Sequence, residues 1–238
     1  MSYQVASQQA VQAAVVMFAA HSVCVGFVMH MDLSGKWAQY SLNRNRLVST
    51  EDYKVGMKSF AFDLVFLFLP FMTFCFWYRA NEIAYCPDSI LLALGKLALG
   101  YILGKFWAFA VHYVLHFPSL YRFHRRHHRN PRSVVAAAAW EDSCVEYAVM
   151  ELPSFAITVM LFPTHFYVHL MHFVLHGWDG ACGHSGYKAP GVLGFLFDGE
   201  YHYYHHAHLT VNYAELEFLD KLFGTHHSQQ PKFIGKKA

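Results

Sequence analysis

The segment 106–128 carries five histidines behind an apolar run. His112 and His116 are four residues apart at the end of a predicted helix, so both imidazoles leave the same helix face. Pro118 ends that helix, because the residue before a proline is disfavoured in the α region. Seven residues separate His116 from a second group with the spacing H-x-x-H-H, formed by His124, His127 and His128.

The same spacing occurs again near the other end of the chain, at His202, His205 and His206. Neutral imidazole is a common protein ligand of zinc, copper and iron. Repeated groups at ligand spacing therefore predict a metal site. We interpret His21 and His30 differently, because a lone histidine in an apolar helix is usually a core or interfacial residue.

The composition is typical of a membrane protein, since 55% of the 238 residues are hydrophobic and 14% are charged. The near-neutral charge balance gives no sign of nucleic-acid binding. The five cysteines include no C-x-x-C pair, which argues against a disulfide framework or a zinc ribbon.

Apolar segments predict membrane-spanning helices at 11–30, at 60–78 with a bend at Pro70, and at 89–111. The first has 20 residues without a charge, or about 30 Å of helix, which matches the apolar core of a bilayer. Basic residues concentrate in the loops 31–58 and 117–143, which places these loops in the cytoplasm and the N-terminus outside.

The next apolar segment, 144–177, is interrupted by Pro153 and Pro163. One metal site cannot take ligands from both sides of a membrane, so this segment is predicted to be a hairpin that returns to the cytoplasmic side. Its arms are short, and the pattern leaves open whether they cross fully. We thus predict an all-α fold: a polytopic membrane helix bundle with a cytosol-facing, histidine-rich metal-binding cap.

The returning arm of this hairpin places four histidines on one helical stripe. His172 and His176 are predicted to reach the depth of the metal site, whereas His165 and His169 are expected to bond neighbouring helices. His184 follows a glycine-rich turn and is free to bend toward the site.

The motifs H-x3-H, H-x2-H-H, H-S-G-Y at 184–187 and a second H-x2-H-H occur in this order, followed by N-Y and D-K-L-F-G-T. Over roughly 100–226 the chain resembles the fatty acid hydroxylase and sterol desaturase superfamily, the membrane-bound histidine-box di-iron oxygenases. The resemblance implies two Fe ions and O2-dependent oxidation of a lipid C–H bond, with no catalytic residue beyond the metal ligands. The ligands it implies are His112, His116, His124, His127, His128, His184, His202, His205 and His206, with a further one from His172 or His176.

The resemblance also implies hydroxylation or desaturation of a sterol or fatty acyl lipid. The electrons would come from a separate donor such as cytochrome b5 and its reductase. The expected location is the endoplasmic reticulum membrane, with a cytoplasmic C-terminus. H-S-G-Y favours the sterol-oxidising branch. Ala214 and Leu219 depart from the family's usual Gly and Trp, and we expect them to pack the tail.

We divide the chain into N-terminal spans with a cytoplasmic loop (1–99), a catalytic region (100–226) and a C-terminal tail (227–238). The alternative function is a membrane metal-binding or transport protein, or a haem-binding helix bundle, without oxygenase activity. Such proteins would carry histidines along their spans, whereas most histidines here lie at span ends.

Two further expectations concern the spans. Asp63 and Lys105 are predicted at similar depth and should form a buried ion pair, because an unpaired charge there would cost several kcal/mol. Aromatic residues near the metal site, Phe106, Trp107 and Phe109, are candidates to line a lipid path, although such residues more often serve packing.

Overall fold

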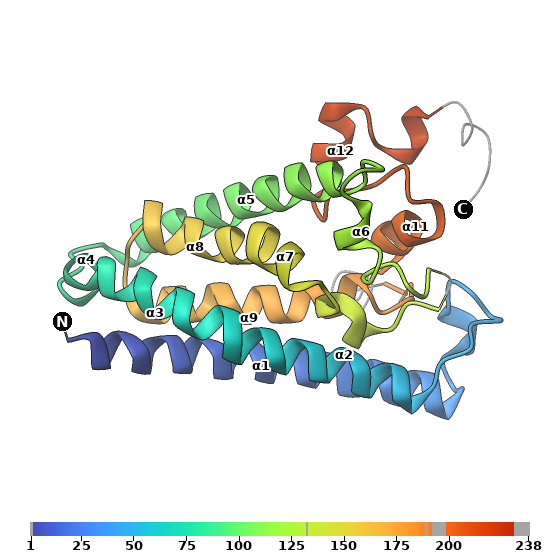
Figure 1. The fold of residues 1–238 in the computed structure, drawn as a ribbon, viewed down its shortest axis with the longest axis horizontal. Coiled ribbons are helices and arrows are strands. Elements are labelled where there is room, and N and C mark those ends of the chain that lie inside the picture. Colours follow the sequence, from blue (N-terminus) through green and yellow to red (C-terminus); the bar gives the residue numbers. More distant parts are fainter. Residues whose placement is uncertain (1, 132, 189, 192–198, 231–238) are drawn as a thin grey trace.

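The computed structural model describes residues 2–131, 133–188, 190–191 and 199–230. Its long helical segments run side by side along the longest axis of the molecule (Figure 1). They are α1 (Tyr3–Ser34), α2 and α3 (Thr50–Asp63 and Leu69–Tyr78), α5 (Ile90–Leu115), α7 and α8 (Cys144–Glu146 and Leu152–Leu161) and α9 (Phe166–Gly183). The predicted all-α bundle is confirmed.

Shorter elements form a cap at one end of the bundle, opposite the N-terminus (Figure 1). This cap includes α6 (Tyr121–His124), a 3-10 turn (Ala136–Trp140), α11 (Glu200–His208), α12 (Glu217–Phe223) and a second 3-10 turn (His227–Gln229). The short helix α4 (Ala80–Ala84) lies at the other end, and a 3-10 turn (Ala38–Tyr40) follows α1. The predicted tail lies mostly outside the described residues, since it runs to 238.

Local sequence signals set the ends of the long helices. The Ser89 side chain accepts a hydrogen bond from the backbone N–H of Leu92 and begins α5. As predicted, α5 ends just before Pro118, and His116 is its C-cap. Helix α1 ends at Gly35, whose φ of 65° lies in the left-handed region that glycine adopts without strain.

Two prolines within the spans follow π-helical turns. The turn Leu64–Phe68 precedes Pro70, and the turn Tyr147–Glu151 precedes Pro153. Proline has no N–H and its ring collides with the carbonyl four residues earlier, so a regular α-helix cannot run through it undistorted. The wider π turn accommodates this, and it lets α2 continue into α3 and α7 into α8.

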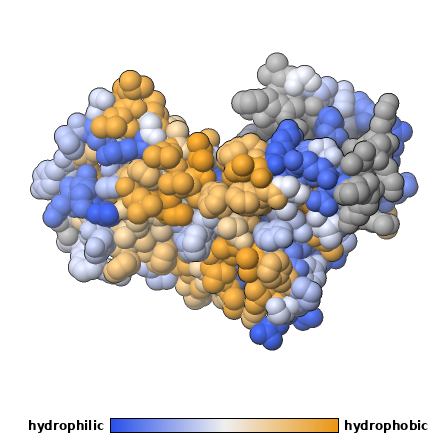
Figure 2. Space-filling model, turned by 90° about the horizontal axis from the view of Figure 1, so that it is seen from above, coloured by the Kyte–Doolittle hydropathy of each residue, from blue (hydrophilic) through white to orange (hydrophobic). Residues whose placement is uncertain are grey.

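Among the described residues, four helical segments are long and apolar enough to cross a membrane: Tyr3–Ser34, Thr50–Tyr78, Ile90–Leu115 and Cys144–Leu161. The chain is therefore a multi-pass membrane protein. Large apolar side chains such as Val15, Phe66 and Leu91 are exposed on these segments, as expected for contact with lipid. The face in Figure 2 is largely hydrophobic over the bundle, with hydrophilic residues gathered toward its ends.

The helices α1 and α9 approach closely at Gly177, where a Cβ atom would lie 2.4 Å from the backbone oxygen of Met17. Small residues permit such contacts between membrane helices. At Gly26, also within α1, a Cβ atom would have no neighbour within 4 Å among the described residues. The two glycines therefore form a matched pair, one at a contact and one in open space.

Gly177→Ala is expected to lower the free energy of unfolding by about 1–3 kcal/mol, because the methyl group forces the two backbones apart. Gly26→Ala should be neutral or slightly stabilising, since alanine favours the helix. Thermal unfolding of the detergent-solubilised proteins measures both. Equal midpoints for the two variants would contradict the close contact.

The predicted ion pair between Asp63 and Lys105 is wrong. The Lys105 ammonium instead contacts Glu215 and lies 2.7 Å from an Asp179 carboxylate oxygen. Asp179 also accepts a hydrogen bond of 2.8 Å from the Tyr101 hydroxyl. Asp63 is buried, and its Oδ2 has no hydrogen-bond partner among the described residues. The error arises because α9 and the segment before α12 bring closer carboxylates to Lys105 than the second span does.

Candidate metal centre

Nine of the predicted histidines meet where α5 reaches the cap. The last turn of α5 carries His112, and His116 caps it. The loop through α6 contributes three histidines, α11 contributes three, and His184 caps the end of α9. The predicted glycine-rich turn is wrong, because Gly177, Gly180 and Gly183 lie within α9. His184 nevertheless lies beside the others, as predicted, because α9 ends next to them.

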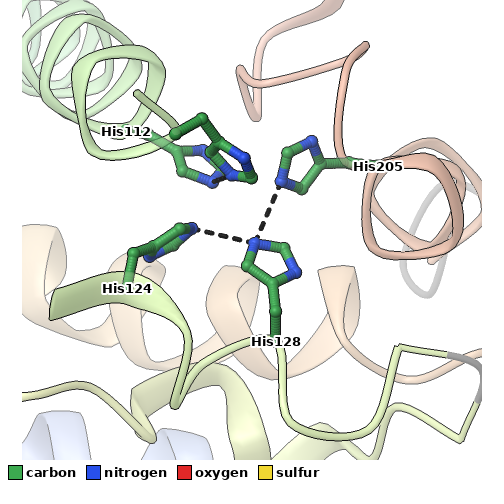
Figure 3. Close-up of side chains that lie close together, drawn as sticks. His112, His124, His128 and His205 are labelled. Carbon is green, nitrogen blue, oxygen red and sulfur yellow. Dashed lines mark hydrogen bonds between the residues drawn. The ribbon is translucent and has the colours of Figure 1, made fainter. Parts of the chain in front are cut away.

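The first group contains five histidines whose ligand atoms all lie within 4.8 Å of one another: His112, His116, His124, His128 and His205. Four of them are labelled in Figure 3, where their rings point toward a common centre. The Nε2 atom of His128 lies 2.8 Å from Nε2 of His124 and 3.3 Å from Nε2 of His205. The Nε2 atoms of His112 and His116 are 3.3 Å apart.

The second group contains four buried histidines within the same 4.8 Å limit: His127, His184, His202 and His206. Nε2 of His184 lies 3.0 Å from Nε2 of both His127 and His202. Nε2 of His206 lies 3.1 Å from Nε2 of His202. The neighbours His127 and His128 belong to different groups, so one loop serves both.

The second ring nitrogen, Nδ1, of three of these histidines is hydrogen-bonded to a backbone carbonyl. Nδ1 of His112 contacts the Tyr213 carbonyl at 2.6 Å, Nδ1 of His205 the Val211 carbonyl at 2.8 Å, and Nδ1 of His184 the Gly180 carbonyl at 2.9 Å. A carbonyl oxygen only accepts, so each Nδ1 must carry the ring proton. In the neutral ring, Nε2 then presents a lone pair.

Several Nε2 lone pairs therefore face one another at distances near 3 Å. Lone pairs repel unless a proton or a cation lies between them, and a metal ion bound by several nitrogens relieves this repulsion for a whole group at once. The donor set thus fits a metal ion in each group. Carbonyls behind metal-binding histidines are a common means of fixing the tautomer.

Burial keeps these histidines neutral. Desolvation, reinforced by neighbouring histidines, lowers the pKa values of His127, His202 and His206 well below the ordinary value. The pKa of His184 falls to about 4, mainly through burial. The neutral imidazole is the form that binds metal ions, so at neutral pH the second group is ready to bind.

Two carboxylates stand behind histidines of this centre, and the sequence analysis missed them. Glu146 accepts a hydrogen bond from Nδ1 of His124. An Asp142 oxygen lies 3.3 Å from Nδ1 of His127. Burial, with the Glu146 carboxylate next in effect, raises the pKa of Asp142 well above its ordinary value. Ser143 and Glu146 form a capping box, a pattern that marks the start of α7 but not the contact of either acid with a histidine.

The structure does not bring His172 or His176 into either group. Nε2 of His172 lies 3.3 Å from the Thr158 hydroxyl, and His176 packs against the rings of Tyr101 and Phe155. Both residues lie earlier on α9 than its capped end at His184, and so within the helix bundle.

The other two histidines of the stripe make hydrogen bonds away from the centre. Nε2 of His165 bonds the Asp88 carbonyl at 2.8 Å, as expected for a bond to a neighbouring segment. The bond of His169 is local, from the backbone N–H of Thr164 at 3.3 Å. His21 is a buried core residue as predicted, with its Nδ1 3.1 Å from the Trp140 indole nitrogen.

A small cavity of about 40 Å³ adjoins both groups. Its apolar lining includes Ala108, Phe109 and Met150, and its polar lining includes Lys105, Glu151 and Glu215. Of the aromatic residues proposed for a lipid path, Phe109 lies at this cavity, while Phe106 and Trp107 are exposed on α5. Ala214 and Leu219 pack with Phe109 and Tyr213 in one buried cluster, as expected for the tail.

Comparisons with known proteins agree with this arrangement. The sequence profile of the fatty acid hydroxylase family matches residues 97–225. Fatty acid hydroxylase ahd1 from Mycosarcoma maydis is 27% identical over 118 residues, which cover 49% of this chain and 30% of that relative. The match thus spans less than a third of the relative's length. No solved structure matches the chain.

The profile match covers more than half of the chain and includes all nine histidines of the two groups. It also includes the Val211–Tyr213 carbonyls and both carboxylates that stand behind those histidines. The chain belongs to the fatty acid hydroxylase family.

Proposed function

We propose that this protein is a membrane lipid hydroxylase that uses two iron ions, dioxygen and electrons from a separate protein. The observation that carries the proposal is the convergence of nine buried histidines in two groups, with Nε2 lone pairs facing one another. Membership of the fatty acid hydroxylase family supports a lipid as the substrate.

The first group would hold one ion and the second group the other. Imidazole suits zinc, copper, nickel and iron, and oxidation of a lipid by dioxygen requires a redox-active metal, which argues against zinc. We choose iron because the resemblance to the histidine-box di-iron oxygenases implies it. When bound, the iron pair would supply the activation of dioxygen that breaks an unactivated C–H bond, which side chains cannot perform. His172 and His176, which lie outside both groups, have no place in this ligand set.

The remaining tasks fall to the chain itself. The carbonyls of Val211 and Tyr213 fix the ring orientation of two first-group histidines. The apolar lining formed by Ala108, Phe109 and Met150 would contact the hydrocarbon part of the lipid and keep water from it. The polar lining, which includes Lys105, would contact the more polar part of the lipid.

Hydroxylation places one oxygen atom of O2 in the C–H bond and reduces the other to water. This balance requires two electrons and two protons from outside. We propose cytochrome b5 and its reductase as the electron source. Arg122 within α6 and Arg125 at its C-cap are exposed, and their positive charge suits an acidic donor.

The catalytic region is proposed to be 100–226, with the iron centre and the C-terminus on the cytoplasmic side of the endoplasmic reticulum membrane. This orientation follows from the arginines of the loop 117–143, because positive loops stay in the cytoplasm.

Lipid profiling of cells tests the function. Cells producing the wild-type chain or its His205→Ala variant are grown under isotopically labelled dioxygen, and sterols and acyl lipids are compared. We expect a lipid with one labelled oxygen atom in the wild type alone, which also identifies the substrate as sterol or acyl. A lipid with a new double bond and no labelled oxygen would show that the reaction is desaturation instead of hydroxylation. Identical lipid profiles in the two cell lines would contradict the proposal.

A further inference from the structure

Two carboxylates beside the metal centre are buried without a cationic side chain to balance them. Asp142 is 1% exposed and Glu146 is 0% exposed. Within the described part of the chain, neither has a lysine or arginine at ion-pair distance. Their neighbour Glu141 is equally buried but lies 2.6 Å from the Arg129 guanidinium. Burying an unbalanced carboxylate costs several kcal/mol, so a reason for keeping Asp142 and Glu146 is required.

Each carboxylate stands behind one histidine of a different group. Glu146 accepts a hydrogen bond from Nδ1 of His124, whose Nε2 belongs to the first group. Asp142 lies 3.3 Å from Nδ1 of His127, whose Nε2 faces His184 in the second group. Nδ1 of His127 has no hydrogen bond of its own among the described residues. One turn of chain, from 142 to 146, thus reaches both groups.

Charge explains why acids are placed there. All nine members of the two groups are histidines, so the donors bring no negative charge to balance two buried cations. A carboxylate behind a metal-binding imidazole balances part of the ion's charge and makes the ring a stronger donor. The acids are costly to bury without the ions and favourable with them.

We propose that Asp142 and Glu146 are positioning residues that retain the two metal ions, Asp142 through His127 in the second group and Glu146 through His124 in the first. The inference rests on the proposed function only in requiring that metal ions bind. The same atoms allow one different arrangement, because ligand atoms of His127, Asp142 and Glu146 lie within 4.8 Å of one another and would suit a third ion. We favour the two-ion arrangement, since Nε2 of His127 already faces the second group.

The test compares Asp142→Asn and Glu146→Gln with the matched control Glu141→Gln. Full-length protein is purified, and its metal is counted by mass spectrometry after dialysis against a weak chelator. Each substitution should weaken the binding of one metal ion about 10–100-fold. Each single variant should therefore retain about half of the wild-type metal, and the double variant almost none. Glu141→Gln should retain all of it, because Arg129 and not a histidine is its partner.

A second readout separates this role from simple structural support. In metal-free protein, Glu141→Gln breaks an ion pair with Arg129 and should lower the thermal midpoint. Asp142 shares a hydrogen bond with Glu146, which an asparagine amide can still donate, and it has no basic partner among the described residues. Asp142→Asn should therefore leave the metal-free midpoint unchanged or raise it. Adding metal should then stabilise the wild type more than the variant.

Full metal content in both variants would overturn the proposal, as would a fall in the metal-free midpoint of Asp142→Asn like that of Glu141→Gln. The wild type could also bind three metal ions per chain, with only the third ion missing from Asp142→Asn. That result would overturn the proposal too, because Asp142 would then be a direct metal ligand. A wild-type protein that binds no metal would instead contradict the proposed function, so the two failures are distinguishable.

Discussion

Replacing His205 with alanine is expected to abolish lipid oxidation, with a loss of at least about 100-fold. His205 is fully buried, its Nδ1 is held by the Val211 carbonyl at 2.8 Å, and its Nε2 lies 3.3 Å from Nε2 of His128. Removing the ring takes one donor from the first group and opens a gap that no described side chain fills. The yield of oxidised lipid per amount of membrane-inserted protein measures the loss.

The matched control is His30→Ala, because His30 lies exposed near the end of α1 and belongs to neither group. Its activity should equal that of the wild type. His21 is a poor control despite its distance from the groups, since it is buried and bonded to Trp140. More than half of the wild-type activity in His205→Ala would contradict its place in the centre.

Asp220→Ala is expected to lower the free energy of unfolding by about 3 kcal/mol or more. The buried Asp220 carboxylate accepts hydrogen bonds from the backbone N–H groups of Tyr213 and Ala214, at 2.9 and 2.7 Å. It also accepts from the hydroxyls of Tyr201 and Thr225. Alanine would leave these buried donors unpaired, each at a cost of about 1–3 kcal/mol.

The same change should reach the metal centre, because Asp220 holds Tyr213 and the Tyr213 carbonyl holds Nδ1 of His112. Lys221→Ala is the matched control on α12, since its side chain is 54% exposed and pairs only with Glu217 at the surface among the described residues. Thermal unfolding in detergent and metal content are measured together. Equal midpoints for the two variants would show that the Asp220 network does not stabilise the cap.

The helical spacing indicated three groups of histidines, and the resemblance to the superfamily implied the nine that meet. The resemblance also implied a further ligand from His172 or His176, and the structure places neither in a group. The sequence was not sufficient to assign these nine histidines to two separate groups. His127 and His128 are adjacent in the chain but face different groups, and this depends on how the loop after α6 turns. His172 and His176 share a stripe at the predicted depth, and His176 lines the cavity beside the two groups. Neither belongs to a group, because their rings contact Tyr101, Phe155 and Thr158 instead.

The ion pairs were the least predictable feature. Counting depth along each span placed Asp63 beside Lys105, but that estimate treats the spans as if they met only each other. The actual partners, Asp179 and Glu215, come from the end of α9 and from the segment before α12. Contacts of this kind arise from tertiary folding, and no periodicity in the sequence encodes them.

The metal content of the purified wild-type protein tests the two-iron centre most directly. Protein produced in iron-supplied cells should contain about two irons per chain and no haem absorption band, because each histidine group holds one ion. His205→Ala should lose the iron of the first group and retain that of the second. One haem per chain, or a folded wild-type protein without any bound transition metal, would contradict the centre.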